Sequence, residues 1–120
     1  MENFDLKKRT FKFSSDIIDL VELLPKTKAV SVISYQLLKS GTSVGANYRA
    51  ALRRRSDREF VSKMNIVLEE ADESLFWLEL IEHKSWISDK LLGDLLKEAN
   101  ELTAIFVSTL NTMHSKRKKS

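Results

Sequence analysis

The sequence has no cysteine among its 120 residues, which excludes disulfides and thiolate metal sites. It has one proline and three glycines, and this scarcity favours a few long helices over a sheet with many turns. No apolar run approaches the roughly 20 residues that cross a membrane, and the charged start MENFDLKKRT is unlike a signal peptide. We therefore expect one all-α domain in a reducing cytoplasm, with no membrane segment.

The spacing of apolar residues predicts four helices, over residues 4–24, 29–54, 56–84 and 88–114. Pro25 ends the first helix, and Ser56 with Glu59 forms the S-x-x-E pattern of a capping box at the start of the third. Short connections force neighbouring helices to be antiparallel, so we expect an up-down-up-down four-helix bundle over residues 1–115. Residues 116–120 have nothing to bury and are expected to form a disordered basic tail.

Residues 40–55, SGTSVGANYRAALRRR, contain mostly small side chains in the first half and four arginines in the second. Gly41 and Gly45 are four residues apart, so they lie on one side of the helix. Each glycine destabilises a helix interior by about 1 kcal/mol relative to alanine. We therefore expect the missing side chains to allow close approach by another backbone.

A polar stripe follows the same helix at the i, i+3, i+7 spacing, formed by Ser40, Ser43 and Asn47. In a tight hairpin these residues lie level with Glu70 and Ser74, and we predict a partly buried hydrogen-bond network among the five. The alternative is a small-residue packing face with solvated serines. Neither histidine lies near enough to act as a base, so we expect no catalytic residue, metal site or cofactor.

Three basic clusters meet at one pole of this topology. They comprise Lys7, Lys8, Arg9 and Lys12; Arg49, Arg53, Arg54, Arg55 and Arg58; and residues 116–119. This basic pole holds 13 of the 20 lysines and arginines but 4 of the 17 acids, so it carries +9 while the remainder carries −6. Concentrated positive charge indicates a polyanion such as nucleic acid, and arginine donates two hydrogen bonds at once to phosphate. The alternatives are a merely solvated charged end, an acidic protein partner, or the acidic flank of a sister subunit.

The third predicted helix has more apolar residues than one core stripe needs. Phe76 shares a stripe with acids that should face outward, and Val61 and Leu80 also fall off the expected core face. Contiguous exposed apolar surface usually marks an interface, so Phe76, Trp77 and Leu80 predict self-association. In the alternative, Trp77 is half-buried under a side chain of the fourth helix.

Residues 36–47 (QLLKSGTSVGAN), 54–56 (RRS) and 59–60 (EF) resemble a bacterial four-helix-bundle family. It was first described as a ribosomal protein because some members are encoded by intervening sequences within large-subunit ribosomal RNA genes. Accessory proteins of diversity-generating retroelements are similar, and residues 70–80 (EADESLFWLEL) resemble one branch. Where many members have Glu-Gly after the motif asparagine, this chain has Ala50-Ala51, so any role of that acid is absent.

The resemblance implies an antiparallel bundle that assembles into a ring-like homopentamer. For the retroelement relatives it also implies a basic surface that binds nucleic acid and a reverse transcriptase. Our leading hypothesis is a non-enzymatic homo-oligomer that binds RNA or another nucleic acid through its basic pole. The second hypothesis is a protein-interaction scaffold, or an accessory subunit of a protein such as a reverse transcriptase.

Overall fold

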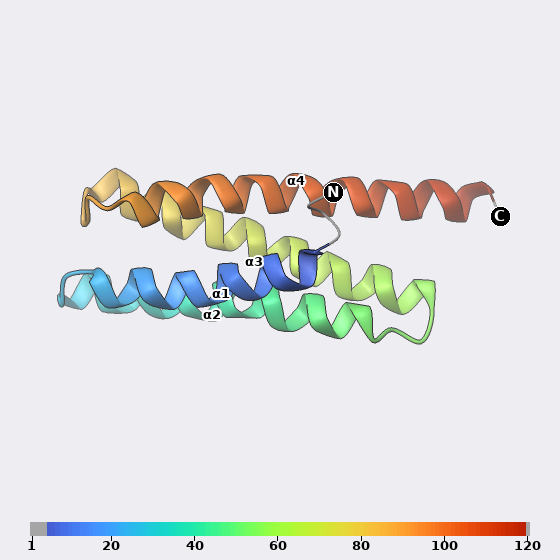
Figure 1. The fold of residues 1–120 in the computed structure, drawn as a ribbon, viewed down its shortest axis with the longest axis horizontal. Coiled ribbons are helices and arrows are strands. Elements are labelled where there is room, and N and C mark those ends of the chain that lie inside the picture. Colours follow the sequence, from blue (N-terminus) through green and yellow to red (C-terminus); the bar gives the residue numbers. More distant parts are fainter. Residues whose placement is uncertain (1–4, 120) are drawn as a thin grey trace.

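The structure is a computed structural model that describes residues 5–119, with side chains described as far as residue 116. Its four α-helices are α1 (Leu6–Leu23), α2 (Lys28–Leu52), α3 (Asp57–Lys84) and α4 (Lys90–Lys119). They run alternately up and down in an elongated bundle of 52 × 24 × 21 Å (Figure 1). The predicted all-α, antiparallel four-helix architecture is confirmed.

Local signals in the sequence set the helix starts. The Thr27 hydroxyl accepts a hydrogen bond from the Val30 N–H at 3.2 Å and caps α2. The Ser56 hydroxyl accepts from the Glu59 N–H at 3.1 Å and caps α3, as the capping-box pattern predicts. The Glu59 carboxylate, however, accepts from the N–H of Arg55 at 2.6 Å, one residue before the cap. The first half of the box is therefore confirmed, and its reciprocal bond is displaced by one residue.

The fourth helix is longer than predicted. It begins beyond Asp89, whose carboxylate accepts a hydrogen bond from the Leu91 N–H at 2.8 Å. It continues to Lys119, past the predicted end near residue 114, so the backbone is helical where a tail was expected. The division into a bundle and a disordered tail stays a prediction, and Ser120 lies outside the described residues.

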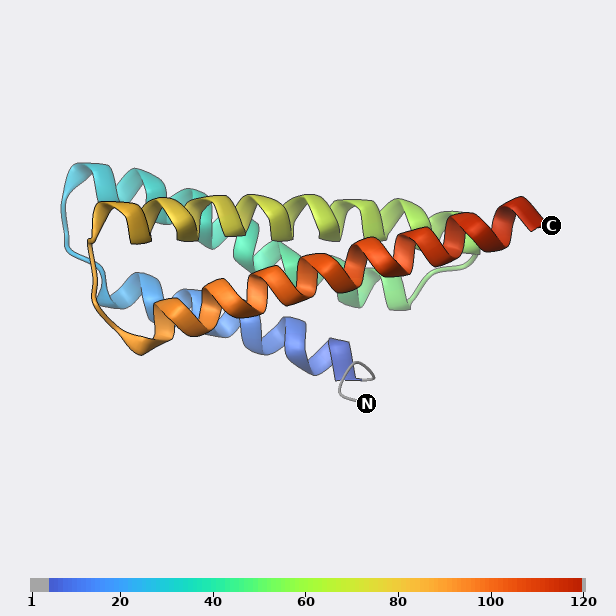
Figure 2. The same cartoon turned by 90° about the horizontal axis from the view of Figure 1, so that it is seen from above.

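The helices pack in chain order, α1 on α2, α2 on α3 and α3 on α4, while α1 and α4 form the least extensive contact. Figure 2 shows α1 and α4 diverging toward the C-terminal end of α4. The helix α1 begins in the half of the bundle that holds the α2–α3 turn, and α4 ends at the same end as this turn (Figure 1). The start of α1 and the end of α4 thus lie toward the end of the bundle that holds the α2–α3 turn, and the meeting of the three basic clusters at one pole stays a prediction.

One hydrophobic core runs through all four helices, with Phe13, Leu37, Leu78 and Phe106 among its fully buried members. Val61 is also buried, at 7% exposure, so its predicted position off the core face is wrong. It precedes the buried Met64 by three residues, which places both side chains on the same face of α3.

The two glycines of α2 lie where α1 approaches most closely. A Cβ atom on Gly41 would lie 2.8 Å from Cγ1 of Ile17, and one on Gly45 would lie 3.1 Å from the backbone oxygen of Thr10. Neither distance leaves room for a methyl group without a shift of α1 or of its side chains. The predicted close approach of a second backbone is confirmed, and the approaching helix is α1.

Candidate nucleic-acid interface

Five arginines surround the turn between α2 and α3, and we call them the arginine corner. Arg49 lies in the last turn of α2, Arg53, Arg54 and Arg55 lie in the turn between the helices, and Arg58 lies in the first turn of α3. All five side chains are exposed. The backbone N–H groups of Arg53 and Arg54 donate to carbonyls of the last turn of α2, so the turn is tight and holds the corner together.

The neighbours of these arginines differ. The guanidinium of Arg49 lies 5.6 Å from the ring centre of Phe11, and that of Arg54 lies 4.7 Å from the ring centre of Phe60. Arg55 approaches the Glu59 carboxylate at 3.5 Å, and the hydrogen bond from its backbone N–H is the main cause that lowers the pKa of Glu59. Within the described side chains, the other four arginines have no carboxylate at ion-pair distance. Their positive charge is therefore available to a ligand.

The basic cluster of α1 is divided between exposed and paired side chains. Lys7 and Lys8 are exposed. Arg9 donates to Glu98 at 2.8 and 2.9 Å and to Glu101 at 3.0 Å, so it joins α1 to α4. These hydrogen bonds and charges raise the pKa of Arg9, with the bond to Glu98 as the largest cause.

Lys12 is paired as well, since its ammonium lies 2.6 Å from the Asp16 carboxylate. Arg9 and Lys12 thus have carboxylate partners, and these carboxylates were not counted when the charge of the basic pole was predicted. Among the described side chains, Lys7 and Lys8 are the residues of this cluster that have no carboxylate at ion-pair distance. Of the C-terminal cluster, Lys116 is described and exposed, and the side chains of residues 117–119 lie outside the description.

An open cavity of about 380 Å³ lies beside the arginine corner, between α1 and α2. Phe11 and Ser14 line it from α1, and Arg49, Arg53 and the small residues between Thr42 and Ala50 line it from α2. Phe11 is 61% exposed although it is a large aromatic residue. This cavity depends on the register between the two helices, so no pattern in the sequence indicated it.

The predicted polar network forms in part. The Ser74 and Ser40 hydroxyls are hydrogen-bonded to each other at 3.0 Å, and both side chains are buried, so α2 and α3 are joined here as predicted. The Asn47 amide instead donates to the backbone carbonyl of Ser43 within its own helix. The backbone carbonyl of Glu70 accepts from Ser74, while burial, with Glu73 next in effect, raises the pKa of the Glu70 carboxyl.

A polar contact that the sequence did not indicate joins α1 to α2. The Ser14 hydroxyl donates to the Gly41 carbonyl at 2.8 Å and accepts from the Gly45 N–H at 3.2 Å. These two backbone groups are the ones that an α-helix pairs with each other. Ser14 therefore bonds to both members of one backbone N–H and carbonyl pair of α2, at the point where the two glycines leave the backbone exposed.

The predicted self-association residues lie on α3, away from the α1–α2 contact. Phe76 is 54% exposed and packs edge-on against Trp77, with ring centres 4.8 Å apart. Trp77 and Leu80 are half-buried, and the Trp77 indole donates to the Glu73 carboxylate at 3.1 Å. The two neighbouring aromatics leave an apolar patch on the surface of the monomer.

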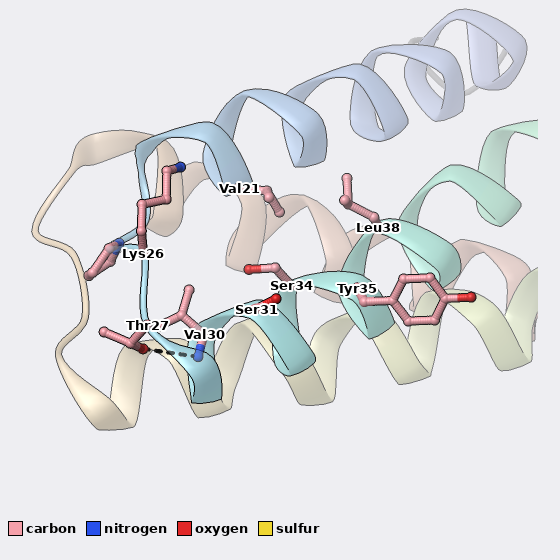
Figure 3. Close-up of a pocket in the computed structure, with 9 residues that line it drawn as sticks. Val21, Lys26, Thr27, Val30, Ser31, Ser34, Tyr35 and Leu38 are labelled. Carbon is pink, nitrogen blue, oxygen red and sulfur yellow. Dashed lines mark hydrogen bonds between the residues drawn. The ribbon is translucent and has the colours of Figure 1, made fainter.

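A second cavity, of about 460 Å³, lies between α1 and α2 at the opposite end of the bundle. Figure 3 shows Val21, Val30, Tyr35 and Leu38 around it, with Lys26 as its charged side chain. The Thr27 hydroxyl also lies here, and it already accepts the capping hydrogen bond from the Val30 N–H. This cavity is mainly apolar and lacks the two arginines that line the first cavity.

Two further features bear on function. In residues 5–116 no group of three or more histidine, aspartate or glutamate side chains is placed to hold a metal ion. The helices described here include none that combines the length and the apolar character needed to span a bilayer.

Comparison with known proteins places this architecture in a family. The family model described as 23S rRNA-intervening sequence protein matches residues 2–108. A crystal structure from Bacteroides thetaiotaomicron, of a protein of unknown function from the S23 ribosomal protein family, is 33% identical with a TM-score of 0.79. The match covers 87% of this chain and 96% of that one. No curated protein compared with the chain matches it.

Proposed function

Because the chain belongs to the 23S rRNA-intervening sequence protein family, we propose that it is a non-enzymatic, homo-oligomeric bundle that binds RNA through its basic pole. The observation that carries this proposal is the arginine corner, where five exposed arginines share one turn. Four of them have no carboxylate partner among the described side chains. The name of the family refers to the genes that encode some of its members, so the choice of RNA among polyanions is part of the proposal.

The arginine corner suits a phosphate backbone in the chemistry of its side chains as well as in charge. Arg49 lies in the last turn of α2, Arg53 follows it at the C-cap, and Arg58 lies in the first turn of α3. Planar guanidinium groups bind phosphate oxygens with two parallel hydrogen bonds. Exposed Lys7 and Lys8 add attraction at longer range. Arg9 and Lys12 contribute less, because their carboxylate partners neutralise them.

The test compares two triple variants that remove the same charge from opposite ends of the bundle. Arg53, Arg54 and Arg55 are changed to alanine in one, and exposed Lys26, Lys28 and Lys84 in the other. Binding of a labelled RNA is titrated at about 50 and about 200 mM salt. Loss of three phosphate contacts lowers the slope of log affinity against log salt by about 2 for a single strand.

The corner variant is expected to lose affinity and salt dependence, and the lysine variant to keep most of both. Equal binding by wild type and both variants would contradict a phosphate-binding corner. An equal loss of RNA affinity in both variants would show that overall charge alone causes the binding, and this would also contradict a phosphate-binding corner.

A second candidate function rests on the apolar patch of α3. We propose that Phe76, Trp77 and Leu80 form a protein interface, used for self-association into the pentamer that the family resemblance implies. The same bundle then acts as a scaffold or accessory subunit, for example of a reverse transcriptase. Support comes from Phe76, since an aromatic ring that is 54% exposed beside a second aromatic is typical of interface surface.

This candidate is tested by the mass of the assembly in solution. Phe76→Glu places a charge in the patch and is expected to reduce the assembly to smaller species in light scattering. Val32→Glu is the control, because Val32 is 56% exposed on α2 and lies outside the patch. An assembly mass that Phe76→Glu leaves unchanged would rule out this surface as the interface.

A further inference from the structure

The cavity between Phe11 and Arg53 has the components of a nucleotide site. Its volume of about 380 Å³ lies within the range of roughly 300–1,000 Å³ that small ligands occupy. The guanidinium groups of Arg49 and Arg53 line the cavity on one side, and the ring of Phe11 lines it from α1. Gly45, Ala46 and Ala50 form the wall between them. The small side chains leave space that larger residues would fill.

Phe11 is exposed to a degree that folding does not explain. It is 61% exposed while Phe13, on the same helix, is 1% exposed and belongs to the core. The Arg49 guanidinium lies 5.6 Å from the ring centre of Phe11, which holds the cation and the ring in one place. The remaining surface of the ring is open to a flat ligand.

The charge of the cavity identifies the ligand as an anion. Arg49 and Arg53 are exposed, lie one turn apart, and have no carboxylate at ion-pair distance in the described part of the chain. Within the cavity lining the charged side chains are these two arginines. A ligand with both a planar ring and a phosphate satisfies the ring and the cations together.

We propose that this cavity binds one unpaired nucleotide of a single-stranded RNA, with its base against Phe11 and its phosphate on Arg49 and Arg53. This inference rests on the proposed RNA-binding function and deepens it. Bases in a duplex are stacked and paired, so their faces are not available to a side chain, whereas unpaired bases stack on aromatic rings. The cavity therefore selects single strands, while the rest of the arginine corner contacts any phosphate backbone.

The experiment measures the affinity of the full chain for single-stranded oligouridine and for an RNA duplex of the same length. Phe11→Leu removes the aromatic face but keeps an apolar side chain, and Phe11→Tyr keeps the face. Tyr35→Leu is the matched control, since Tyr35 is similarly exposed at 63% on α2, beside the cavity at the opposite end of the bundle. Thermal unfolding of each variant checks that the substitution leaves the bundle folded.

Stacking of one base predicts that Phe11→Leu weakens single-strand binding by about five- to hundred-fold. Duplex binding is expected to change by less than about twofold, because phosphate contacts carry it. Phe11→Tyr is expected to restore single-strand affinity, and Tyr35→Leu to resemble wild type. Ultraviolet crosslinking of 5-iodouridine RNA is expected to modify the peptide that contains Phe11.

Two outcomes overturn the base-binding inference while leaving the arginine corner intact. One is a Phe11→Leu variant that binds single strands as wild type does. The other is an equal loss for single strand and duplex, which would indicate that Phe11 acts only by holding Arg49. If wild type binds neither RNA, or if the Arg53, Arg54 and Arg55 variant binds both as wild type does, the proposed function itself fails.

Discussion

The closest contact between α1 and α2 gives a stability prediction of defined sign. Gly41→Ala places a Cβ atom 2.8 and 2.9 Å from the two Cγ atoms of Ile17, and 3.2 Å from its Cβ. Ile17 is fully buried and β-branched, so it has little freedom to move away. We expect Gly41→Ala to destabilise the bundle, although alanine is the better helix former.

The magnitude follows from two opposing terms. Overpacking a dense core costs about 1–3 kcal/mol, and replacing glycine by alanine in a helix contributes up to about 1 kcal/mol in favour of folding. The net destabilisation is therefore roughly 0–2 kcal/mol. Gly93→Ala is the matched control, because nothing lies within 4 Å of a Cβ at Gly93 in α4. The difference between the two variants isolates the overpacking term of about 1–3 kcal/mol.

The assay is denaturant unfolding monitored by circular dichroism, with the free energy of unfolding compared at equal slope. A third variant, Gly41→Ala with Ile17→Ala, removes both Cγ atoms that the new Cβ meets. In that background Gly41→Ala should become neutral or stabilising, as a double-mutant cycle measures. If Gly41→Ala alone stabilises the bundle as much as Gly93→Ala does, the close-approach reasoning is wrong.

Three further substitutions test contacts between and within helices. Arg9→Ala removes the ion pairs from α1 to Glu98 and Glu101, and should destabilise by about 1–3 kcal/mol in denaturant unfolding, with amide exchange rising first in α1. Ser74→Ala should destabilise by about 1 kcal/mol, because the buried Ser40 hydroxyl loses its hydrogen-bond partner on α3, and a Ser40→Ala background should reduce this effect.

Burial raises the folded-state pKa of Glu70 above its unfolded value, so its ionisation opposes folding as the pH rises through that range. Glu70→Gln should therefore stabilise the bundle near neutral pH, and the gain should vanish in acid where the carboxyl is protonated in both states.

The fold was predictable because local signals and apolar periodicity agree. Thr27 and Ser56 cap helices where the pattern places helix starts, and Pro25 follows the end of α1. Val61 was misplaced because neighbouring apolar residues surround it, and the sequence alone does not fix which face turns inward. The residue types determine where the helices form, and the packing determines which of several apolar faces turns toward the core.

The candidate site was predictable in charge and less so in geometry. The arginine corner follows directly from the sequence, because its five residues lie between positions 49 and 58, on either side of the α2–α3 turn. The pairing of Arg9 with Glu98 depends on the register between α1 and α4, which are distant in the sequence. The bridge from Ser14 to Gly41 and Gly45 likewise required the α1–α2 register. Neither contact leaves a periodic pattern in the chain.

Close packing of α1 on α2 also determines the geometry of the proposed site. Gly45 lets Thr10 and Ser14 approach α2, and Phe11 is then carried to within 5.6 Å of Arg49. Any substitution that pushes α1 outward changes the separation of the ring from the guanidinium before it unfolds the bundle. Gly45→Ala should therefore weaken single-strand binding more than duplex binding, in parallel with Phe11→Leu. In the proposed site, the small residues of this stretch therefore position the aromatic ring, and the arginines that follow supply the positive charge beside it.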